Sequence, residues 1–251
     1  GLTDLQNQTI SEQDYVKKEV KDFNKIDIKS SSYNVLIKNG DVDKATLSYY
    51  QKTKNLIDIS VKDGQLTIND NNSELDSTSN KHINFFGLKD LVRLSTLNEE
   101  VRNKTIVITL PKTQTIDFLK VDLATGNLDL SNSTIKQADI NLNVGDLTFT
   151  KMIVSNLKAN LDVGSVDSDH TLFTNSDLSI AMGDYSGDNL IFNGHNKLDV
   201  TSGDIEIALS DYTLNVQADS HSGEVDITNN LKISKDNTLT ITSDLGDITV
   251  E

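Results

Sequence analysis

A glycine that recurs every 19 to 23 residues constrains the fold of this 251-residue chain more than any other feature of its sequence. An apolar or aromatic residue stands two positions after each of these glycines, and another stands five positions before it. One repeat of this length is too short to bury its own apolar face, so the copies must stack on one another. The repeated glycines are Gly126, Gly145, Gly164, Gly183, Gly203, Gly223 and Gly246.

Apolar residues at alternate positions on either side of the glycine predict two short β-strands joined by a tight corner. At the usual strand spacing of about 4.8 Å, stacked copies would form one continuous core. We therefore expect an all-β chain folded as a single-stranded β-solenoid, which is a parallel, right-handed β-helix with coils of 19–20 residues. We expect glycine at the corner because it tolerates a positive φ.

The β-solenoid domain is expected to span residues 23–251, with an opening strand that contains Phe23 and Ile28. Weaker copies of the repeat surround Gly40 and Gly64. Residues 1–22 have a mixed charge and few strand-forming residues, so we expect a linker or short helix that follows a membrane anchor in a longer protein.

The period breaks over residues 69–104, which we interpret as an insertion. Its apolar residues could cover an edge or seam of the solenoid. Alternatively, the insertion could bind a partner through Phe85, Phe86 and Leu88.

The end of the chain is less regular than the middle. The strand register is ambiguous around residues 217–222, because Leu214 and Val216 also have a strand pattern. The final strand, 248–251, ends in the middle of the pattern. We expect the open end of the solenoid there, capped by oligomerisation or covered by another part of the molecule.

Several segments resemble one known family: "FNKIDIKSSSYNVLI", "TIVITLP", "VDLATGNLDL", "INLNVGDLTF" and "LDVTSGDIEI". These strands with Gly-Asp corners are similar to the bacterial putative-adhesin family, a domain of unknown function, over residues 22–251. The resemblance implies a β-solenoid ectodomain on the extracellular side of the bacterial envelope, anchored to the membrane in the full-length protein. It implies an adhesin or an interaction or envelope-stress scaffold, and it brings no catalytic residues and no cofactor. The Lys-, Asn- and Asp-rich composition is similar to that of Gram-positive surface proteins.

Charge and composition exclude several classes of function. The chain has 23 Lys and Arg against 38 Asp and Glu, a net charge of −15 and a pI of about 4.6, which opposes binding to nucleic acid. The absence of Cys excludes disulfide frameworks and thiolate metal sites. We expect any charge-steered partner to be cationic: a basic protein, a cationic peptide, a cell-wall component or divalent ions. Acidity also keeps a long β-stack soluble, and this explanation needs no partner.

The acidic residues that follow the corner glycines are candidate calcium ligands. Stacking in register would place carboxylates of neighbouring coils about 5 Å apart. Ser165 interrupts this row, and Asp can instead accept hydrogen bonds from nearby backbone N–H groups, which is the simpler interpretation. The candidates are Asp146, Asp184, Asp204 and Asp247.

The four histidines argue against a metal or catalytic site, because their positions relative to the repeat glycines differ. The alternative function is a carbohydrate-active β-helix enzyme, a lyase or hydrolase with paired carboxylates, acting on acidic or neutral polysaccharide. A sugar-stacking groove would be poorly supplied with aromatic residues, and we therefore expect no enzyme. The tyrosines considered for such a groove are Tyr33, Tyr49, Tyr50, Tyr185 and Tyr212.

Overall fold

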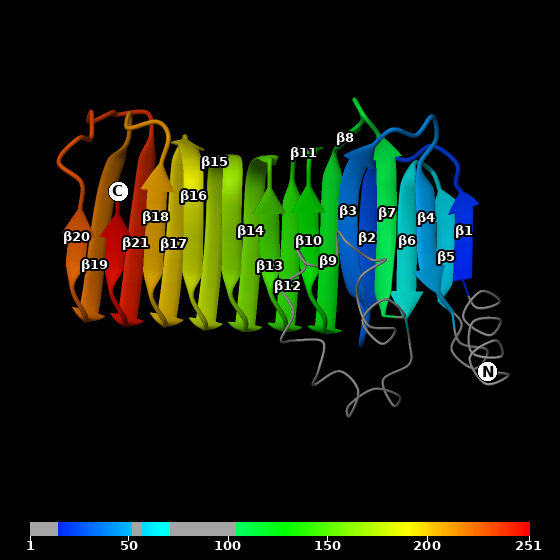
Figure 1. Cartoon of the computed structure of the whole chain (residues 1–251), viewed down its shortest axis with the longest axis horizontal. Helices are drawn as coiled ribbons and strands as arrows, with labels where there is room; N and C mark the ends of the chain where they lie inside the picture. Colours follow the sequence, from blue (N-terminus) through cyan, green and yellow to red (C-terminus); the bar gives the residue numbers. More distant parts are fainter. Residues whose placement is uncertain (1–14, 52–56, 71–103) are drawn as a thin grey trace, which may run out of the picture.

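Every element of secondary structure in the computed structural model, which describes residues 15–51, 57–70 and 104–251, is a β-strand (Figure 1). No helix in these ranges is long and apolar enough to cross a membrane. Most strands pair in parallel with the strand one coil further along. Leu128 pairs with Leu147, and Leu147 pairs with Val166, so one coil takes 19 residues here. The predicted all-β, stacked-coil architecture is confirmed, and the fold is β-solenoid-like.

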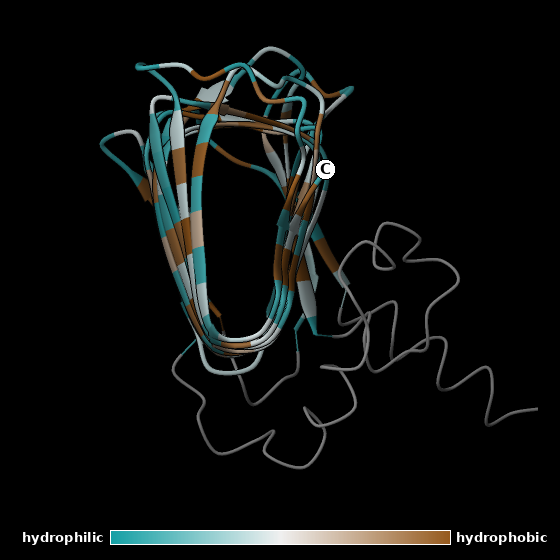
Figure 2. Cartoon of the chain, turned by 90° about the vertical axis from the view of Figure 1, so that its left-hand side faces the viewer, coloured by the Kyte–Doolittle hydropathy of each residue, from teal (hydrophilic) through white to brown (hydrophobic). Residues whose placement is uncertain are grey.

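Each coil has two long walls that meet in a rounded bend, which is the lower end of the coils in Figure 2. Wall A contains the strands that precede the corner glycines, and wall B those that follow them. In spatial order, wall A contains β6 (Gln65–Asp70), β2 (Lys25–Ser30), β9 (Phe118–Thr125), β12 (Ala138–Val144), the ends of β14 (Ile153–Val163) and β15 (Val166–Met182), β17 (His195–Ser202), β21 (Thr238–Leu245) and β19 (Asn215–Ser222).

Wall B follows the same order of coils, and a short third side closes each coil opposite the bend. Wall B contains β7 (Thr105–Pro111), β3 (Asn34–Gly40), β10 (Leu128–Ser131), β13 (Leu147–Thr150), the starts of β15 and β16 (Tyr185–Asn193), β18 (Ile205–Leu209), β22 (Ile248–Val250) and β20 (Val225–Ile227). The third side contains β8 (Thr115–Ile116), β11 (Thr134–Ile135) and the remaining parts of β14, β15 and β16.

The corner glycines are required by close approach of neighbouring coils. A Cβ atom on Gly145 would lie 1.8 Å from the carbonyl oxygen of Gly126, and one on Gly164 would lie 1.7 Å from that of Gly145. Such distances leave no room for any side chain. The expectation that positive φ selects glycine holds for Gly183, at 148°, but Gly145 is not among the residues with positive φ. The expectation was therefore incomplete, because the backbone packing acts at every corner.

Two further corners in the middle coils use residues with left-handed φ, and the glycine pattern did not reveal them. Asn and Asp adopt this conformation more readily than most residues because their side chains hydrogen-bond locally. Between wall B and the third side these residues are Asn132, Lys151, His170 and Asn189, and between the third side and wall A they are Asn156, Asn175 and Gly194.

The interior of the coils is filled by rows of apolar side chains in register. The rings of Phe149 and Phe173 meet edge to face at 5.1 Å, and Phe173 stacks on Phe192 at 5.6 Å. Ser168 and Gly187 interrupt the pattern of wall B, and the side chains of Leu190 and Tyr185 occupy the space beside Gly187. The Tyr185 hydroxyl donates a hydrogen bond to Ser168 Oγ at 3.2 Å, and burial raises the pKa of Tyr185.

The first strands of the chain differ from the expected repeat. The predicted opening strand is present as β2, which contains Ile28 but begins after Phe23, and the segment around Gly64 is not a coil. It is an antiparallel hairpin of β5 (Asp58–Lys62) and β6. Asp63 and Gly64 have φ of 51° and 76°, and two successive positive φ values are typical of a two-residue hairpin turn. The copy predicted at Gly64 was therefore wrong.

Two antiparallel strands extend wall B at its N-terminal end: β4 (Thr46–Tyr50) pairs with β7, and β1 (Tyr15–Glu19) pairs with β4. The linker or short helix expected over residues 1–22 is therefore wrong for 15–19, which form a strand, whereas 1–14 lie outside the described residues. The predicted insertion 69–104 is described only at its two ends.

The last coil of the sequence does not lie at the end of the solenoid. Strand β21 pairs with β17 on one side and with β19 on the other. Strand β22 likewise lies between β18 and β20. The C-terminal coil is therefore inserted between the two coils that precede it, and the expected open end at residues 248–251 is wrong. The last coil in space is β19 and β20, where Val225 is 42% exposed.

Candidate functional site

The residues after the corner glycines form a hydrogen-bonded ladder along the bend. In each rung, a side-chain oxygen accepts a hydrogen bond from the backbone N–H of the equivalent residue in the next coil, at 2.8–3.2 Å. The ladder runs through Asn34, Asn127, Asp146, Ser165, Asp184, Asp204, Asp247 and Glu224. The simpler interpretation of the acidic corners, acceptance of backbone hydrogen bonds, therefore describes their geometry.

The order of residues in the ladder shows how the four calcium candidates lie relative to one another. Asp184, Asp204 and Asp247 occupy consecutive coils, whereas Ser165 separates them from Asp146. Within the described ranges, no three His, Cys, Asp or Glu side chains are placed to hold one metal ion. The four carboxylates therefore stay untested calcium candidates, whereas the backbone hydrogen bonds that they accept need no ion. The Asn and Ser members of the ladder show that a neutral acceptor performs the same structural role.

Two carboxyl groups, Asp146 at the bend and Asp129 on wall B, have unusual environments. Burial raises the pKa of Asp146, against the opposing effect of the hydrogen bond from the Ser165 N–H. Asp129 is 1% exposed, neither of its carboxyl oxygens has a hydrogen-bond partner, and burial raises its pKa to about 7. In register, Asp129 lies between Leu36 and Thr148, so an apolar and a neutral residue flank the carboxyl group.

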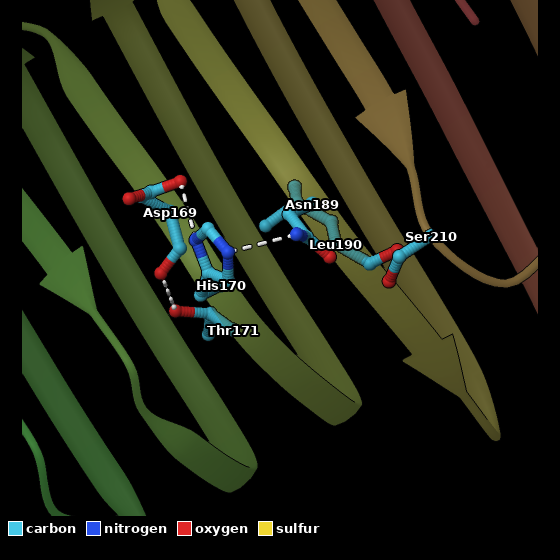
Figure 3. Close-up of polar contacts among 6 residues, drawn as sticks. All are labelled: Asp169, His170, Thr171, Asn189, Leu190 and Ser210. Atoms are coloured by element: carbon cyan, nitrogen blue, oxygen red, sulfur yellow. Dashed lines mark hydrogen bonds and ion pairs between the residues drawn. The ribbon is translucent and has the colours of Figure 1, made fainter.

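His170 lies on an exposed corner and contacts two polar neighbours (Figure 3). Its Nδ1 lies 2.9 Å from Asp169 Oδ1, and its Nε2 lies 2.8 Å from the amide nitrogen of Asn189. The amide donates to Nε2, so the ring proton lies on Nδ1 and points to Asp169. The Thr171 hydroxyl donates to the backbone oxygen of Asp169 at 2.9 Å. The arrangement is an Asp–His pair whose second nitrogen is occupied by an amide, where a nucleophile would have to stand in a catalytic triad.

The tyrosines considered for a sugar-stacking groove are largely enclosed: Tyr33, Tyr49 and Tyr185 are at most 5% exposed. Sequence reasoning missed Tyr15, which is 41% exposed and lies 5.0 Å from the ring of Tyr50. Tyr15, Tyr49 and Tyr50 line one cleft, whereas Tyr33, Tyr185 and Tyr212 do not line it.

Two shallow clefts lie at the N-terminal end, where β1 and β4 extend wall B. The first has a volume of about 250 Å³ and includes Tyr15, Tyr50 and Lys17 in its lining. The second has a volume of about 390 Å³ and is lined by charged residues of both signs, among them Lys18 and Asp43. The clefts therefore lie in the part of the molecule with the most mixed charge.

The net negative charge of the chain comes from residues 113–251. Residues 1–112 contain 16 Lys and Arg and 16 Asp and Glu, so their formal charges cancel. Residues 113–251 contain 7 Lys and 22 Asp and Glu, and 7 − 22 gives the whole net charge of −15. These residues form all the coils from β8 and β9 to the far end, which Figure 1 colours green to red. The acidic surface is therefore one continuous stretch of the solenoid.

The three residues predicted to bind a partner through the insertion, Phe85, Phe86 and Leu88, lie outside the described residues.

Comparison with known proteins gives one family and several structures of similar fold. The sequence profile of the family described as Toastrack DUF4097 matches residues 23–251. No curated protein matches the chain. A putative adhesin from Bacteroides fragilis is similar, with 17% identity, a TM-score of 0.55, and coverage of 94% of this chain and 96% of that one.

Two further structures are similar over nearly their whole length. A putative lipid binding protein from Parabacteroides distasonis has 13% identity and a TM-score of 0.51, with coverage of 96% of this chain and 98% of that one. A putative cell adhesion protein from Clostridium sporogenes has 14% identity and a TM-score of 0.37, with coverage of 94% and 97%. At 13–17% identity, the two matches with a TM-score above 0.5, from Bacteroides fragilis and Parabacteroides distasonis, show the fold alone.

Proposed function

Because the chain belongs to the Toastrack DUF4097 family, we propose that it works through the outer surface of its stacked coils, as a non-catalytic domain of the bacterial cell envelope. The domain would lie on the extracellular side and would be held there by a membrane anchor elsewhere in the full-length protein. Its role would be that of an adhesin or an interaction scaffold, and its partner a cationic protein, a cationic peptide or a basic component of the cell wall.

The observation that carries this proposal is the charge distribution. The 139 residues of 113–251 carry the whole net charge of −15. A surface with one sign of charge attracts partners of the other sign and raises their association rate. Solubility alone would be served as well by net charge spread over the whole chain, and it gives no reason why the formal charges of residues 1–112 cancel.

Envelope location is supported by two observations. The composition is rich in Lys, Asn and Asp, as expected for a Gram-positive surface protein. The Bacteroides fragilis structure of similar fold is described as a putative adhesin. We extend that description to this chain as a proposal.

We also infer that the coil is right-handed. A connection between two parallel strands of one sheet is right-handed in nearly all proteins, because of the twist of the strands. Each coil here makes such a connection, for example from β12 through β13 to β14.

A carbohydrate-active enzyme is the alternative, and the geometry gives it little support. Asp129 has a pKa of about 7, which suits a general acid, but it is 1% exposed and does not line either of the two clefts. His170 has its Nε2 occupied by Asn189.

The proposal is tested by isothermal titration of the domain with an oligolysine and with an oligoglutamate of equal length. We expect the oligolysine to bind, its affinity to fall as salt is raised, and the oligoglutamate not to bind. Equal binding of both peptides, or of neither, would contradict the proposal. Release of sugar products from a panel of acidic and neutral polysaccharides would favour the enzyme.

A further inference from the structure

The residues that directly precede the corner glycines form an exposed row along the acidic half of the bend. Val144 pairs with Val163, and Val163 pairs with Met182. The row continues through Ser202 to Leu245 and ends at Ser222. Its apolar members are Val144, Val163, Met182 and Leu245, which we call the apolar row.

The apolar row is unusual because its side chains do not enter the core. Val163 is 46% exposed, Met182 is 60% exposed and Leu245 is 57% exposed, although each stands two residues from a fully buried position. Scattered apolar residues are common on protein surfaces, but Val144, Val163 and Met182 stand in register on three neighbouring coils and form a strip, which resumes at Leu245 after Ser202. Such a strip is typical of an interaction surface.

Carboxylates border the apolar row on both sides. One residue before it in the chain stand Asp162 and Asp244, both exposed. Two residues after it stand Asp184, Asp204 and Asp247, whose Oδ1 atoms accept the ladder hydrogen bonds and whose side chains are exposed. The strip therefore has an apolar centre and two acidic borders.

We propose that this strip is a docking surface for a cationic amphipathic helix. The apolar row from Val144 to Leu245 crosses four strand spacings, about 19 Å, which a helix of about 13 residues covers. Its apolar face would lie on the row, and Lys side chains on both flanks of that face would reach the carboxylates. The proposal rests on the proposed function, since it names the kind of cationic partner and the place where it binds.

The first arm of the test compares two peptides of identical composition. One is a helical peptide of Leu and Lys, about 18 residues long, with Leu at helical spacing. The other is a scrambled version without an apolar face. Both carry the same charge, so attraction by the acidic half acts on both, and we expect the amphipathic peptide to bind about tenfold more tightly.

The second arm changes the row without disturbing the fold. In the double variant Met182→Ser and Leu245→Ser, serine replaces two residues of a row that already holds Ser202 and Ser222. We expect the preference for the amphipathic peptide to be lost. The matched control is Ile153→Thr, which removes a side chain 48% exposed on the third side, where Thr134 holds the equivalent place. This control should keep the preference.

The third arm removes charge and keeps the ladder. The triple variant Asp184→Asn, Asp204→Asn and Asp247→Asn retains a carbonyl acceptor at each rung, as Asn127 does. We expect weaker binding of both peptides and an unchanged melting temperature.

The outcomes separate the two proposals. Equal binding of both peptides, with no effect of the row variant, would overturn the docking surface and leave the proposed function standing. Failure of both peptides to bind would overturn both proposals. Binding of uncharged phosphatidylcholine vesicles that is lost in the row variant would show that the row inserts into lipid, and this result would also overturn the docking of a helix.

Discussion

The Oδ1 atom of Asp204 accepts a hydrogen bond from the backbone N–H of Asp247 at 2.9 Å, although the two residues are 43 positions apart in the chain. Asp247 in turn accepts a hydrogen bond from the N–H of Glu224, which precedes it. From Asp204 the ladder therefore passes to Asp247, near the end of the chain, and then back to Glu224. This order follows from the insertion of the C-terminal coil, which gives the end of the chain neighbours on both sides.

Engineered disulfides test this order of coils, since the chain has no Cys of its own. Thr240 pairs with Lys197 on one side and with Gln217 on the other. Neighbouring strands about 4.8 Å apart are within the range for a disulfide, whereas positions two strands apart, at about 9.6 Å, are not. We expect the pairs Lys197→Cys with Thr240→Cys and Gln217→Cys with Thr240→Cys to form bonds under mild oxidation.

The pair Lys197→Cys with Gln217→Cys is the control, and it should keep both thiols free. Mass spectrometry after thiol alkylation distinguishes free from disulfide-bonded cysteines in each variant. A bond between 197 and 217, with free thiols in the other two variants, would mean that the coils stack in the order of the sequence.

Substitution of the corner glycines should have a large effect on stability. In Gly164→Ala the new Cβ would lie 1.7 Å from the backbone oxygen of Gly145, which cannot move without separating the coils. We expect a loss of at least about 3 kcal/mol in the free energy of unfolding. In Gly40→Ala the nearest atom is a methyl group of Thr109 at 3.0 Å, so we expect a loss below about 1 kcal/mol. Urea denaturation measures both, and similar losses would contradict the account of the corner.

Asp129 should make the domain less stable as the pH rises. Its pKa is raised to about 7 in the folded state, so between about pH 4 and about pH 7 the folded state binds a proton that the unfolded state has lost. The contribution of Asp129 to the free energy of unfolding therefore falls by up to about 4 kcal/mol as the pH rises through that range.

The variant Asp129→Thr, which copies the neighbouring Thr148, should remove this dependence. Compared with the unmodified protein, its free energy of unfolding should be higher at about pH 8, and the difference should shrink towards about pH 4. The measurement is urea denaturation of both proteins at several pH values. A difference that stays constant with pH would show that the carboxyl group ionises normally.

Calcium should have no effect on the melting temperature. The ladder carboxylates already accept backbone hydrogen bonds, and Ser165 and Asn127 perform the same role without charge. Extracellular calcium modules bind with dissociation constants of roughly 10⁻⁴–10⁻³ M, so calorimetry with about 5 mM calcium, against a chelator control, is a sufficient test. A saturable rise in the melting temperature would show that Asp184, Asp204 and Asp247 hold the ion.

The sequence predicted the coil because apolar residues at fixed distances from the glycine have to share one interior. Leu128, Leu147 and Val166 pair as the period requires. The sequence also indicated that the acidic corners accept backbone hydrogen bonds, but it did not show that each donor belongs to the neighbouring coil. The concentration of charge in residues 113–251 was visible in the sequence as well, but it acquires a meaning only once those residues are known to form one stretch of the solenoid.

The order of the end coils could not be predicted, because each coil offers its neighbours the same pattern of alternating apolar residues. Stacking in the order of the sequence would place Asn215 beside His195, whereas in the structure Thr238 pairs with both residues. The segment around Gly64 was mistaken for a coil for a related reason, since its apolar spacing fits a coil as well as an antiparallel hairpin. The Asp63–Gly64 pair was the available signal for a hairpin.

The claim that the acidic coils bind a cationic partner is tested most directly by mapping where such a partner binds. The measurement is the change in backbone amide chemical shifts of the isotope-labelled domain on addition of the amphipathic Leu–Lys peptide. We predict that the shifted amides lie in residues 113–251 and centre on the bend around Val163, Met182 and Leu245. Shifts centred on the clefts beside Tyr15 and Tyr50, or no shifts at all, would contradict the account.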